Sequence, residues 1–225
     1  MGLAALPRRD ADARDRLEQL GVQARPMVLA RERAIELGPH AGADVGGLAA
    51  LVPGGALTRG SVLRVVGDAG ATTVGFELAA AVTAVGEWAA VVDLDSSLGA
   101  LAAAEAGVAL ERFAVVRRVP PARWATAVAA LIDGVSLVLA DVPRGVQLGD
   151  ARRLVARARE RETVLVVHER DARWPGDAAL TLHVVGATWT GIVDAGHLTH
   201  RSLQVRAVGR GVAARAVTSE LARAV

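Results

Sequence analysis

The stretch VLRVVGDAGATTVGFELAAAV, which runs from Val62 to Val82, decides the fold of this chain. A mostly apolar run predicts a buried strand that ends at Gly67, and a second glycine, Gly70, precedes a run that is typical of a helix. A strand, a glycine loop and a helix that begins with two threonines form the layout of a phosphate-binding loop. The backbone N–H groups at the helix N-terminus attract anions in such a loop.

The residues that follow this stretch continue the alternation of strand and helix. Strands are expected at 61–66, 88–95, 112–117, 135–143 and 163–168. Helices are expected at 72–85, 121–133 and 148–162, with an alanine-rich helix that ends near Ala106. Continuous apolar strands between helices predict an α/β fold with a mainly parallel sheet and helices on both faces. After His168 the pattern alternates, which predicts antiparallel strands at the C-terminal edge.

The chain divides into three segments. Residues 1–45 are charged and glycine-containing, and we expect an N-terminal helical extension and linker, with a short helix at 10–21 and a weak one at 31–37. Residues 46–212 carry the regular pattern and form the expected core. Residues 213–225 are expected to form a C-terminal tail, either a short helix or a loose segment.

Composition excludes several classes of protein. The 225 residues contain no cysteine, so disulfides and thiolate metal sites are absent. No uncharged apolar run is long enough for a membrane span, and we expect a cytoplasmic protein. All 26 basic residues are arginines, and the formal net charge is only +2. This balance does not indicate a nucleic-acid-binding surface.

Acidic residues stand where a parallel sheet places its ligands, at the carboxyl ends of strands. Asp93 and Asp95 end one expected strand, and Asp141 ends another. A glycine loop, a helix and acidic strand ends together are typical of a site that binds a nucleotide and a metal ion.

The order of these features resembles the RecA-like branch of the P-loop fold family. The segment LVPGGALTRGSVLRVVGDAGATT is similar to that family's approach to its phosphate loop, and VSLVLADV is similar to its Walker B strand. TVLVVHER is similar to the next strand, which in that family ends in a glutamine that senses the γ-phosphate. The resemblance covers about residues 48–211 and rests on the ordered set of motifs.

The resemblance implies an ATP site, but the loop departs from the family pattern. The loop from Gly67 to Thr73 is two residues shorter than G-x-x-x-x-G-K-[ST], or lacks its first glycine, and the whole sequence has no lysine. The degenerate nucleotide loop therefore consists of Gly67, Gly70, Ala71, Thr72 and Thr73.

The acidic positions depart from the family pattern as well. Asp95 stands where the family has a catalytic glutamate, and Asp141 stands at the metal-binding position. Glu169 replaces the neutral glutamine, and its carboxylate would repel a γ-phosphate. We interpret these three residues as vestigial metal or water positions. We expect no catalytic residue, no enzymatic activity, no metal site, no cofactor, and at most weak binding of ATP and Mg²⁺.

Within this family the sequence resembles the ImuA-type proteins, especially their actinobacterial form. That resemblance implies a non-catalytic adaptor in damage-induced mutagenesis, acting in translesion DNA synthesis during the SOS response. The implied partners are an ImuB-type Y-family-like protein and, through it, an error-prone polymerase and the sliding clamp. The segments that would correspond to the DNA loops of RecA are short here, so we expect no recombinase activity.

Two alternatives remain open at this point. The chain could be a weak nucleotide-binding regulator that keeps phosphates through the loop amides, Thr72 and Asp141. It could also be a DNA-binding RecA paralogue that uses the arginine-rich helix at 148–162. On that helix Arg152, Arg153 and Arg157 are candidates for contact with a partner or with DNA, although arginines beside acidic residues also form ordinary solvated surfaces.

Overall fold

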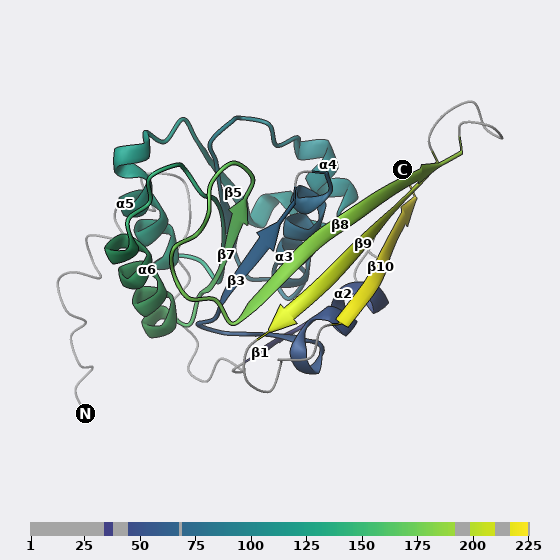
Figure 1. Cartoon of the computed structure of the whole chain (residues 1–225), viewed down its shortest axis with the longest axis horizontal. Coiled ribbons are helices and arrows are strands. Elements are labelled where there is room, and N and C mark those ends of the chain that lie inside the picture. Colours follow the sequence, from purple (N-terminus) through teal and green to yellow (C-terminus); the bar gives the residue numbers. More distant parts are fainter. Residues whose placement is uncertain (1–33, 38–44, 68, 192–198, 210–216, 225) are drawn as a thin grey trace.

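The structure of the chain is a computed structural model that describes residues 34–37, 45–67, 69–191, 199–209 and 217–224. A twisted eight-stranded sheet forms its centre, and Figure 1 shows helices α5 and α6 on one side of it and α2, α3 and α4 on the other. This architecture confirms the predicted α/β fold with a mainly parallel sheet. No helix in the described ranges is long and apolar enough to cross a lipid bilayer.

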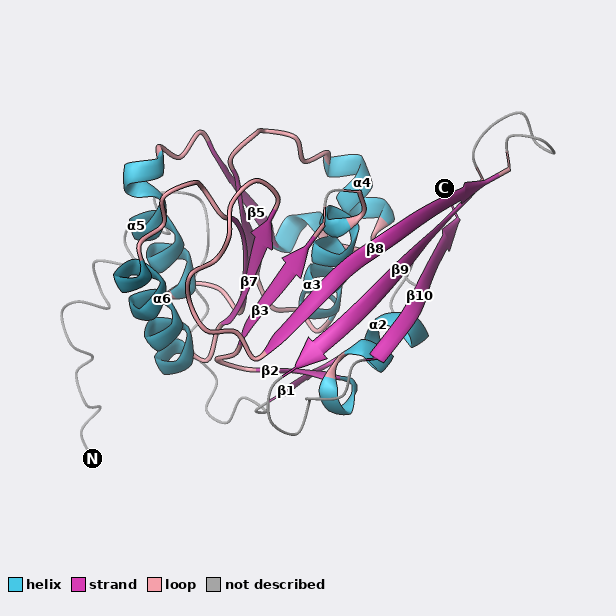
Figure 2. Cartoon of the chain, in the orientation of Figure 1, coloured by secondary structure: helices cyan, strands magenta, loops and turns pink. Residues whose placement is uncertain are grey.

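The strands of the large sheet lie in the order β10-β9-β8-β3-β7-β6-β4-β5. Six neighbouring strands, from β8 to β5, run parallel, while β9 runs antiparallel to β8 and β10 antiparallel to β9 (Figure 2). The bounds of these strands are β3 Val62–Val66, β4 Ala89–Asp93, β5 Phe113–Arg117, β6 Leu137–Asp141, β7 Val164–Glu169, β8 Leu180–Thr190, β9 His200–Gly209 and β10 Val217–Ala224. A separate two-stranded sheet pairs β1 Ala34–Glu36 with β2 Ala56–Thr58.

The helices begin and end where local chemistry favours it. Pro121 starts α5 because its ring presets the backbone angle of a first turn, and Glu162 ends α6 in a left-handed conformation with φ 55°. The helix bounds are α2 Val45–Leu51, α3 Ala71–Ala84, α4 Ala100–Glu105, α5 Pro121–Ile132 and α6 Leu148–Arg161, with 3-10 turns at Pro53–Gly55 and Leu110–Arg112.

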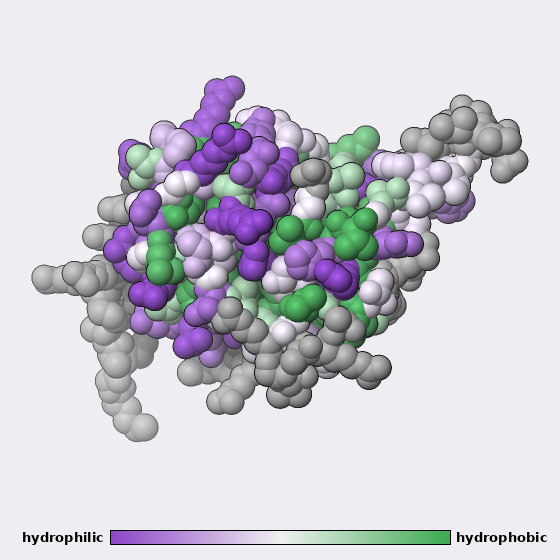
Figure 3. Space-filling model, viewed as in Figure 1, coloured by the Kyte–Doolittle hydropathy of each residue, from purple (hydrophilic) through white to green (hydrophobic). Residues whose placement is uncertain are grey.

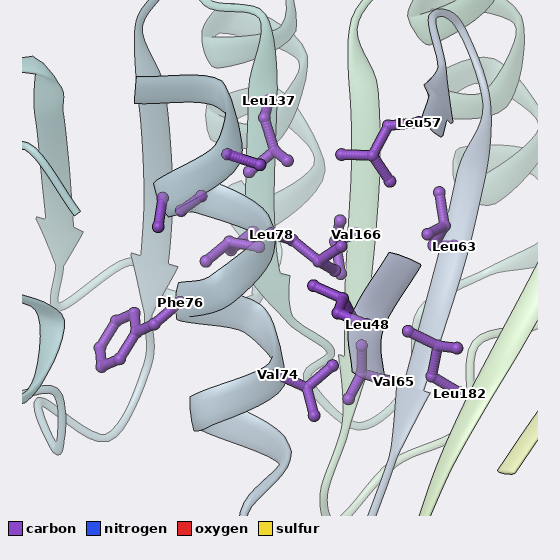
Figure 4. Close-up of a cluster of buried hydrophobic side chains, with 14 of the residues drawn as sticks. Leu48, Leu57, Leu63, Val65, Val74, Phe76, Leu78, Leu137, Val166 and Leu182 are labelled. Carbon is purple, nitrogen blue, oxygen red and sulfur yellow. The ribbon is translucent and has the colours of Figure 1, made fainter. Parts of the chain in front are cut away.

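Two apolar layers hold the helices against the sheet. Alternate residues of β3 enter different layers, since Leu63 and Val65 join the layer under α3 and Val62 joins the layer under α5 and α6. Figure 4 shows Val74 and Leu78 of α3 within the first layer. The second layer contains Trp124 and Trp174, which pack edge to face with centroids 6.3 Å apart and are almost completely buried.

Three of the predicted segments lie near the ends of the chain. The weak helix expected at 31–37 is wrong over 34–36, where the chain forms β1 and buries Ile35 beneath the sheet. The expected helix at 10–21 lies outside the described residues. The helix or tail expected at 213–225 is instead strand β10 over 217–224. Strand β10 forms backbone hydrogen bonds with the outer edge of β9. This tertiary pairing overrides the helix propensity of the alanines in the segment.

The edge strands differ from the prediction in one respect. Antiparallel strands were expected after His168, where the structure first has a strand of 11 residues, β8. Its first half runs parallel to β3, and a bulge between Val184 and Gly186 adjusts its pairing with β9. The region is therefore antiparallel only from the β8–β9 pair outward.

Candidate functional site

The glycine loop between β3 and α3 is covered by strand β9. Gly70 precedes α3 with φ 97°, a conformation that glycine tolerates best. A Cβ atom at this position would lie 2.5 Å from the Cδ2 atom of Leu203 and 2.8 Å from a guanidinium nitrogen of Arg201. In a phosphate loop the missing side chain lets the backbone approach the ligand, whereas here it lets the backbone approach β9.

Thr73, in the first turn of α3, is bonded to the same strand. The Nη1 group of Arg201 donates a hydrogen bond to the hydroxyl oxygen of Thr73 over 2.8 Å. The guanidinium of Arg201 also lies 5.0 Å from the ring centroid of Trp189 on β8, in cation–π geometry. These contacts fasten the hairpin of β8 and β9 to the start of α3.

Thr72 has an arginine partner from another element. The Nη2 group of Arg170, directly after β7, donates to the Thr72 hydroxyl over 2.8 Å, and its Nη1 group donates to the hydroxyl of Ser97 over 3.2 Å. Arg170 nitrogens also lie 3.9 Å from an Asp95 carboxylate oxygen and 3.8 Å from one of Asp141. The guanidinium therefore stands between the threonine hydroxyl and two strand-end carboxylates.

Asp141 is a buried member of this cluster. Its carboxylate accepts a hydrogen bond from the backbone N–H of Leu94 over 3.3 Å and lies 3.1 Å from Nδ1 of His168. The Nε2 atom of His168 is buried and has no hydrogen-bond partner among the described residues. When Nδ1 carries the proton it donates to Asp141, which leaves Nε2 as an acceptor.

Asp93 stabilises the turn after β4. Its fully buried carboxylate accepts hydrogen bonds from the backbone N–H groups of Ser97 and Leu98, over 3.1 and 3.2 Å, and from Nε of Arg117 over 3.0 Å. These three donors account for the burial of its charge, so Asp93 orders the turn that carries Ser97 toward Arg170.

Glu169 lies on the opposite face of the sheet from the glycine loop. Its carboxylate forms a two-point ion pair with Arg64 of β3, with both N–O distances 2.8 Å, and accepts a hydrogen bond from the backbone N–H of Trp174. Successive strand residues point to opposite faces, so the neighbouring His168 faces Asp141 instead. The structure thus brings Asp95 and Asp141 together and leaves Glu169 apart from them.

The arginine-rich helix α6 contains residues with different roles. The side chain of Arg153 is 77% exposed and pairs with Asp150 on the same helix. Arg157 forms a two-point ion pair with Asp133, at the end of α5, and Arg161 joins the same carboxylate over 3.1 Å. The hydrogen bonds that Arg157 donates to the Asp133 carboxylate raise the pKa of Arg157 above its usual value. Arg152 is exposed, and no ion pair joins it to another described residue.

A hollow of about 200 Å³ opens above the strand ends. Both charge signs line it, from the side chains Asp95, Asp141, Arg144, His168, Arg170 and Asp171. Within the described part of the chain, no three histidine or acidic side chains gather closely enough to hold a metal ion. The hollow can accept a small polar group, but its carboxylates already face the cation of Arg170.

The sequence analysis did not assign to this site four residues that determine it. Arg64 lies inside the quoted stretch, where nothing distinguishes it from other strand residues. His168 and Arg170 flank Glu169, so the order HER was the local signal for these two residues. Arg201 comes from a distant strand, and no motif links it to the loop.

Comparison with solved structures supports the fold. The crystal structure of the RadB recombinase matches this chain with a TM-score of 0.51 and 15% sequence identity, over 77% of this chain and 91% of that one. At this identity the likeness concerns the fold alone, which is RecA-like. No curated protein matches the chain by sequence.

Comparison with protein-family models places the chain by sequence. The model described as the MT3502 N-terminal domain matches residues 50–176, which is more than half of the chain and runs from α2 to just beyond Trp174. The matched range includes the glycine loop, Asp95, Asp141 and Arg170 but ends before Arg201. This protein therefore belongs to the MT3502 N-terminal domain family.

Proposed function

We propose that this protein is a non-catalytic accessory protein of the ImuA type, acting as an adaptor in damage-induced mutagenesis. It would contact an ImuB-type Y-family-like protein in the cytoplasm and, through it, an error-prone polymerase and the sliding clamp. The proposal that the protein is not an enzyme rests on the position of Arg170. Its guanidinium donates a hydrogen bond to Thr72 and faces the carboxylates of Asp95 and Asp141.

The position of Arg170 matters because a RecA-like ATPase holds its magnesium ion with the same kinds of groups. There a threonine hydroxyl from the loop and a strand-end aspartate bind the metal, which bridges the phosphates. In this chain the guanidinium supplies a permanent positive charge at those groups, since arginine does not lose its proton in proteins. A metal ion would have to displace Arg170 and break its hydrogen bonds to Thr72 and Ser97.

The glycine loop supports the same proposal. Leu203 and Arg201 lie against Gly70, where the β-phosphate of a nucleotide would need the backbone N–H groups. The sequence supplies no lysine to neutralise such a phosphate. A RecA-like sheet with a covered loop still offers a rigid body for protein contacts, which is the property an adaptor needs.

Two measurements test this proposal. Titration of the full chain with Mg·ATP, followed by intrinsic tryptophan fluorescence and by calorimetry, should show no binding below the millimolar range and no hydrolysis above background. In cells that lack the chain, the wild type and the Asp141→Asn variant should both restore damage-induced mutagenesis at equal protein abundance. Asparagine keeps an oxygen acceptor for Leu94 but removes the charge that a metal site requires.

Opposite results would identify a different function. A micromolar dissociation constant for Mg·ATP, together with loss of mutagenesis in the Asp141→Asn variant, would replace the adaptor with a nucleotide-binding regulator. Normal damage-induced mutagenesis in cells without the chain would contradict the role in mutagenesis itself.

A further inference from the structure

Unpaired arginines gather at the edge of the sheet where the parallel strands end. Arg118 directly follows β5, and Arg123 lies in the first turn of the next helix, α5. Arg144 follows β6, and Arg173 follows β7. All four are exposed, and no ion pair joins any of them to another residue in the described ranges. We call these four arginines the basic edge.

The sheet topology brings the basic edge to one side of the molecule. Strands β5, β6 and β7 belong to the parallel part of the sheet, so their carboxyl ends lie at the same edge. Arg144 lines the hollow above these strand ends. The hydrogen bond from the backbone N–H of Trp174 to Glu169 keeps Arg173 beside the end of β7. Figure 3 shows hydrophilic residues gathered at the top of the view, above the strand ends.

The opposite edge of the sheet shows that unpaired arginines are not the rule in this chain. Arg59, before β3, forms a two-point ion pair with Glu87, before β4. Arg157 and Arg161, toward the end of α6, both pair with Asp133, before β6. Arginines at the amino ends of the strands thus have carboxylate partners within the chain, whereas those of the basic edge have none among the described residues.

The charge around the basic edge is positive in excess. Helices α5 and α6 both begin there, and no side-chain hydrogen bond caps either one, so their N–H groups add partial positive charge. Of the nearby carboxylates, Asp150 pairs with Arg153 and Asp95 faces Arg170. Asp171 remains without an ion pair within the described ranges, against the four cations of the basic edge.

The backbone of Arg118 supports a functional role for this edge. Its φ angle is 57°, in the left-handed region that residues with a Cβ atom rarely adopt. Its side chain is exposed and makes no hydrogen bond to another described residue that would offset this strain. Strain of this kind collects at binding sites, where a ligand contact compensates for it.

We infer that the basic edge binds an acidic segment of the Y-family-like partner, an inference that rests on the proposed function. A guanidinium group pairs with a carboxylate through two parallel hydrogen bonds, which gives both affinity and direction. Because the four arginines come from three separate connections, they offer an extended segment several positions for a carboxylate.

The surface chemistry favours this occupant over two others. A nucleic acid would match the positive charge, but Trp124 and Trp174, the aromatic residues of these connections, are buried, which leaves no platform for base stacking. A regular run of phosphates would also meet the exposed carboxylates of Asp95 and Asp171 in the hollow. A second copy placed edge to edge would set arginines against arginines, and like charges at short range repel.

Calorimetry with two probes tests the inference on the full chain. The probes are the full-length Y-family-like protein and a short poly-L-glutamate. Arg123→Glu and Arg173→Glu should each weaken binding of both probes roughly threefold or more, and together roughly tenfold or more. Arg159→Glu is the matched control, because Arg159 is exposed in the last turn of α6, at the opposite edge. Thermal unfolding checks that each variant is folded.

Arg118→Gly separates binding from a merely structural role. Glycine adopts a positive φ angle without strain, so this variant should not lower the melting temperature. It should nonetheless weaken binding of both probes, because one guanidinium is lost. Unchanged binding in Arg118→Gly, Arg123→Glu and Arg173→Glu would overturn the basic edge.

The two probes distinguish this inference from the proposed function. Binding of poly-L-glutamate that the edge variants weaken, without binding of the Y-family-like protein, contradicts the proposed function and keeps the basic edge as a site for acidic segments. Binding of the Y-family-like protein with equal affinity in all edge variants overturns the basic edge alone. A single-stranded oligonucleotide whose binding is lost in the edge variants, with partner binding unchanged, assigns the edge to nucleic acid instead.

Discussion

The Nη1 group of Arg201, on β9, donates a hydrogen bond to the hydroxyl oxygen of Thr73, in the first turn of α3, over 2.8 Å and across 128 positions of sequence. The bond joins β9, the strand that runs antiparallel to β8, to the helix that follows the glycine loop. With Leu203 of the same strand against Gly70, it converts a loop that could face a ligand into a packed contact between two elements.

Restoring the missing lysine should not restore nucleotide binding. Ala71 is fully buried, so the Ala71→Lys side chain would have to bury its ammonium group or disturb the start of α3. We expect a loss of about 2 kcal/mol or more in the free energy of unfolding and no stabilisation by Mg·ATP, measured by thermal shift. Ala69→Lys, at an exposed position of the same loop, should leave stability unchanged. ATP hydrolysis by Ala71→Lys would show that the loop lacks only its lysine.

Removing Arg170 should create a magnesium site. Arg170→Ala leaves the carboxylates of Asp95 and Asp141 and the hydroxyl of Thr72 without their cation, and oxygen ligands of this kind suit Mg²⁺. Millimolar Mg²⁺ should then raise the melting temperature of Arg170→Ala by roughly 2–4 °C, through binding to the folded state, and should not raise that of the wild type.

The control for that experiment is Arg144→Ala. Arg144 lines the same hollow but is exposed and forms no ion pair with either of these two carboxylates, so its removal should not create a magnesium response. An equal magnesium shift in both variants would mean that Arg170 does not act as the internal cation.

The ion pair between Arg64 and Glu169 should contribute to stability. Glu169→Gln removes the charge, and the buried amide then provides only one oxygen for Arg64 and the Trp174 N–H. Because Arg64 is partly exposed, we expect a loss of about 1–3 kcal/mol in urea unfolding, less than for a fully buried pair. A double-mutant cycle with Arg64→Met should give a coupling energy of about 1 kcal/mol or more, and zero coupling would contradict the pair.

Two arginines of α6 should respond differently to charge reversal. Arg157→Glu would place a carboxylate beside Asp133 and break the link between α6 and α5, at a cost of about 1–2 kcal/mol in unfolding free energy. Arg153→Glu, at a position 77% exposed, should change stability by less than about 0.5 kcal/mol. Equal effects in chemical denaturation would show that the Arg157 pair is only a surface contact.

His183 should make stability depend on pH. Its pKa is lowered in the folded state below the ordinary value of about 6.5, so the unfolded chain binds more protons in the window just below that value. Stability should therefore fall as pH drops through this window and be recovered above it, and the His183→Gln variant should lose this contribution. Arg206→Ala should move the pKa of His183 upward, which NMR titration of the imidazole protons would measure; no movement would mean that Arg206 does not act on His183.

Local sequence was enough to locate the elements and one part of the site. Apolar runs and glycines set the strand before Gly67, the helix after Gly70 and the strand that ends at Asp141, because burial periodicity and backbone preference act over a few residues. Parallel strands share one carboxyl edge, so the approach of Asp95 and Asp141 toward the loop also followed from the sequence.

Only the tertiary structure decided what occupies that edge. The pairs Arg201–Thr73, Arg170–Thr72 and Arg64–Glu169 join positions 128, 98 and 105 residues apart. Whether such side chains meet depends on strand order and on register, and a shift of one residue would exchange His168 and Glu169 between the two faces. For the same reason the pairing of β10 was decided by the free edge of β9 and not by the alanines of its own sequence. The hydrophobic pattern that specifies a strand carries no information about the distant arginine that will neutralise its end.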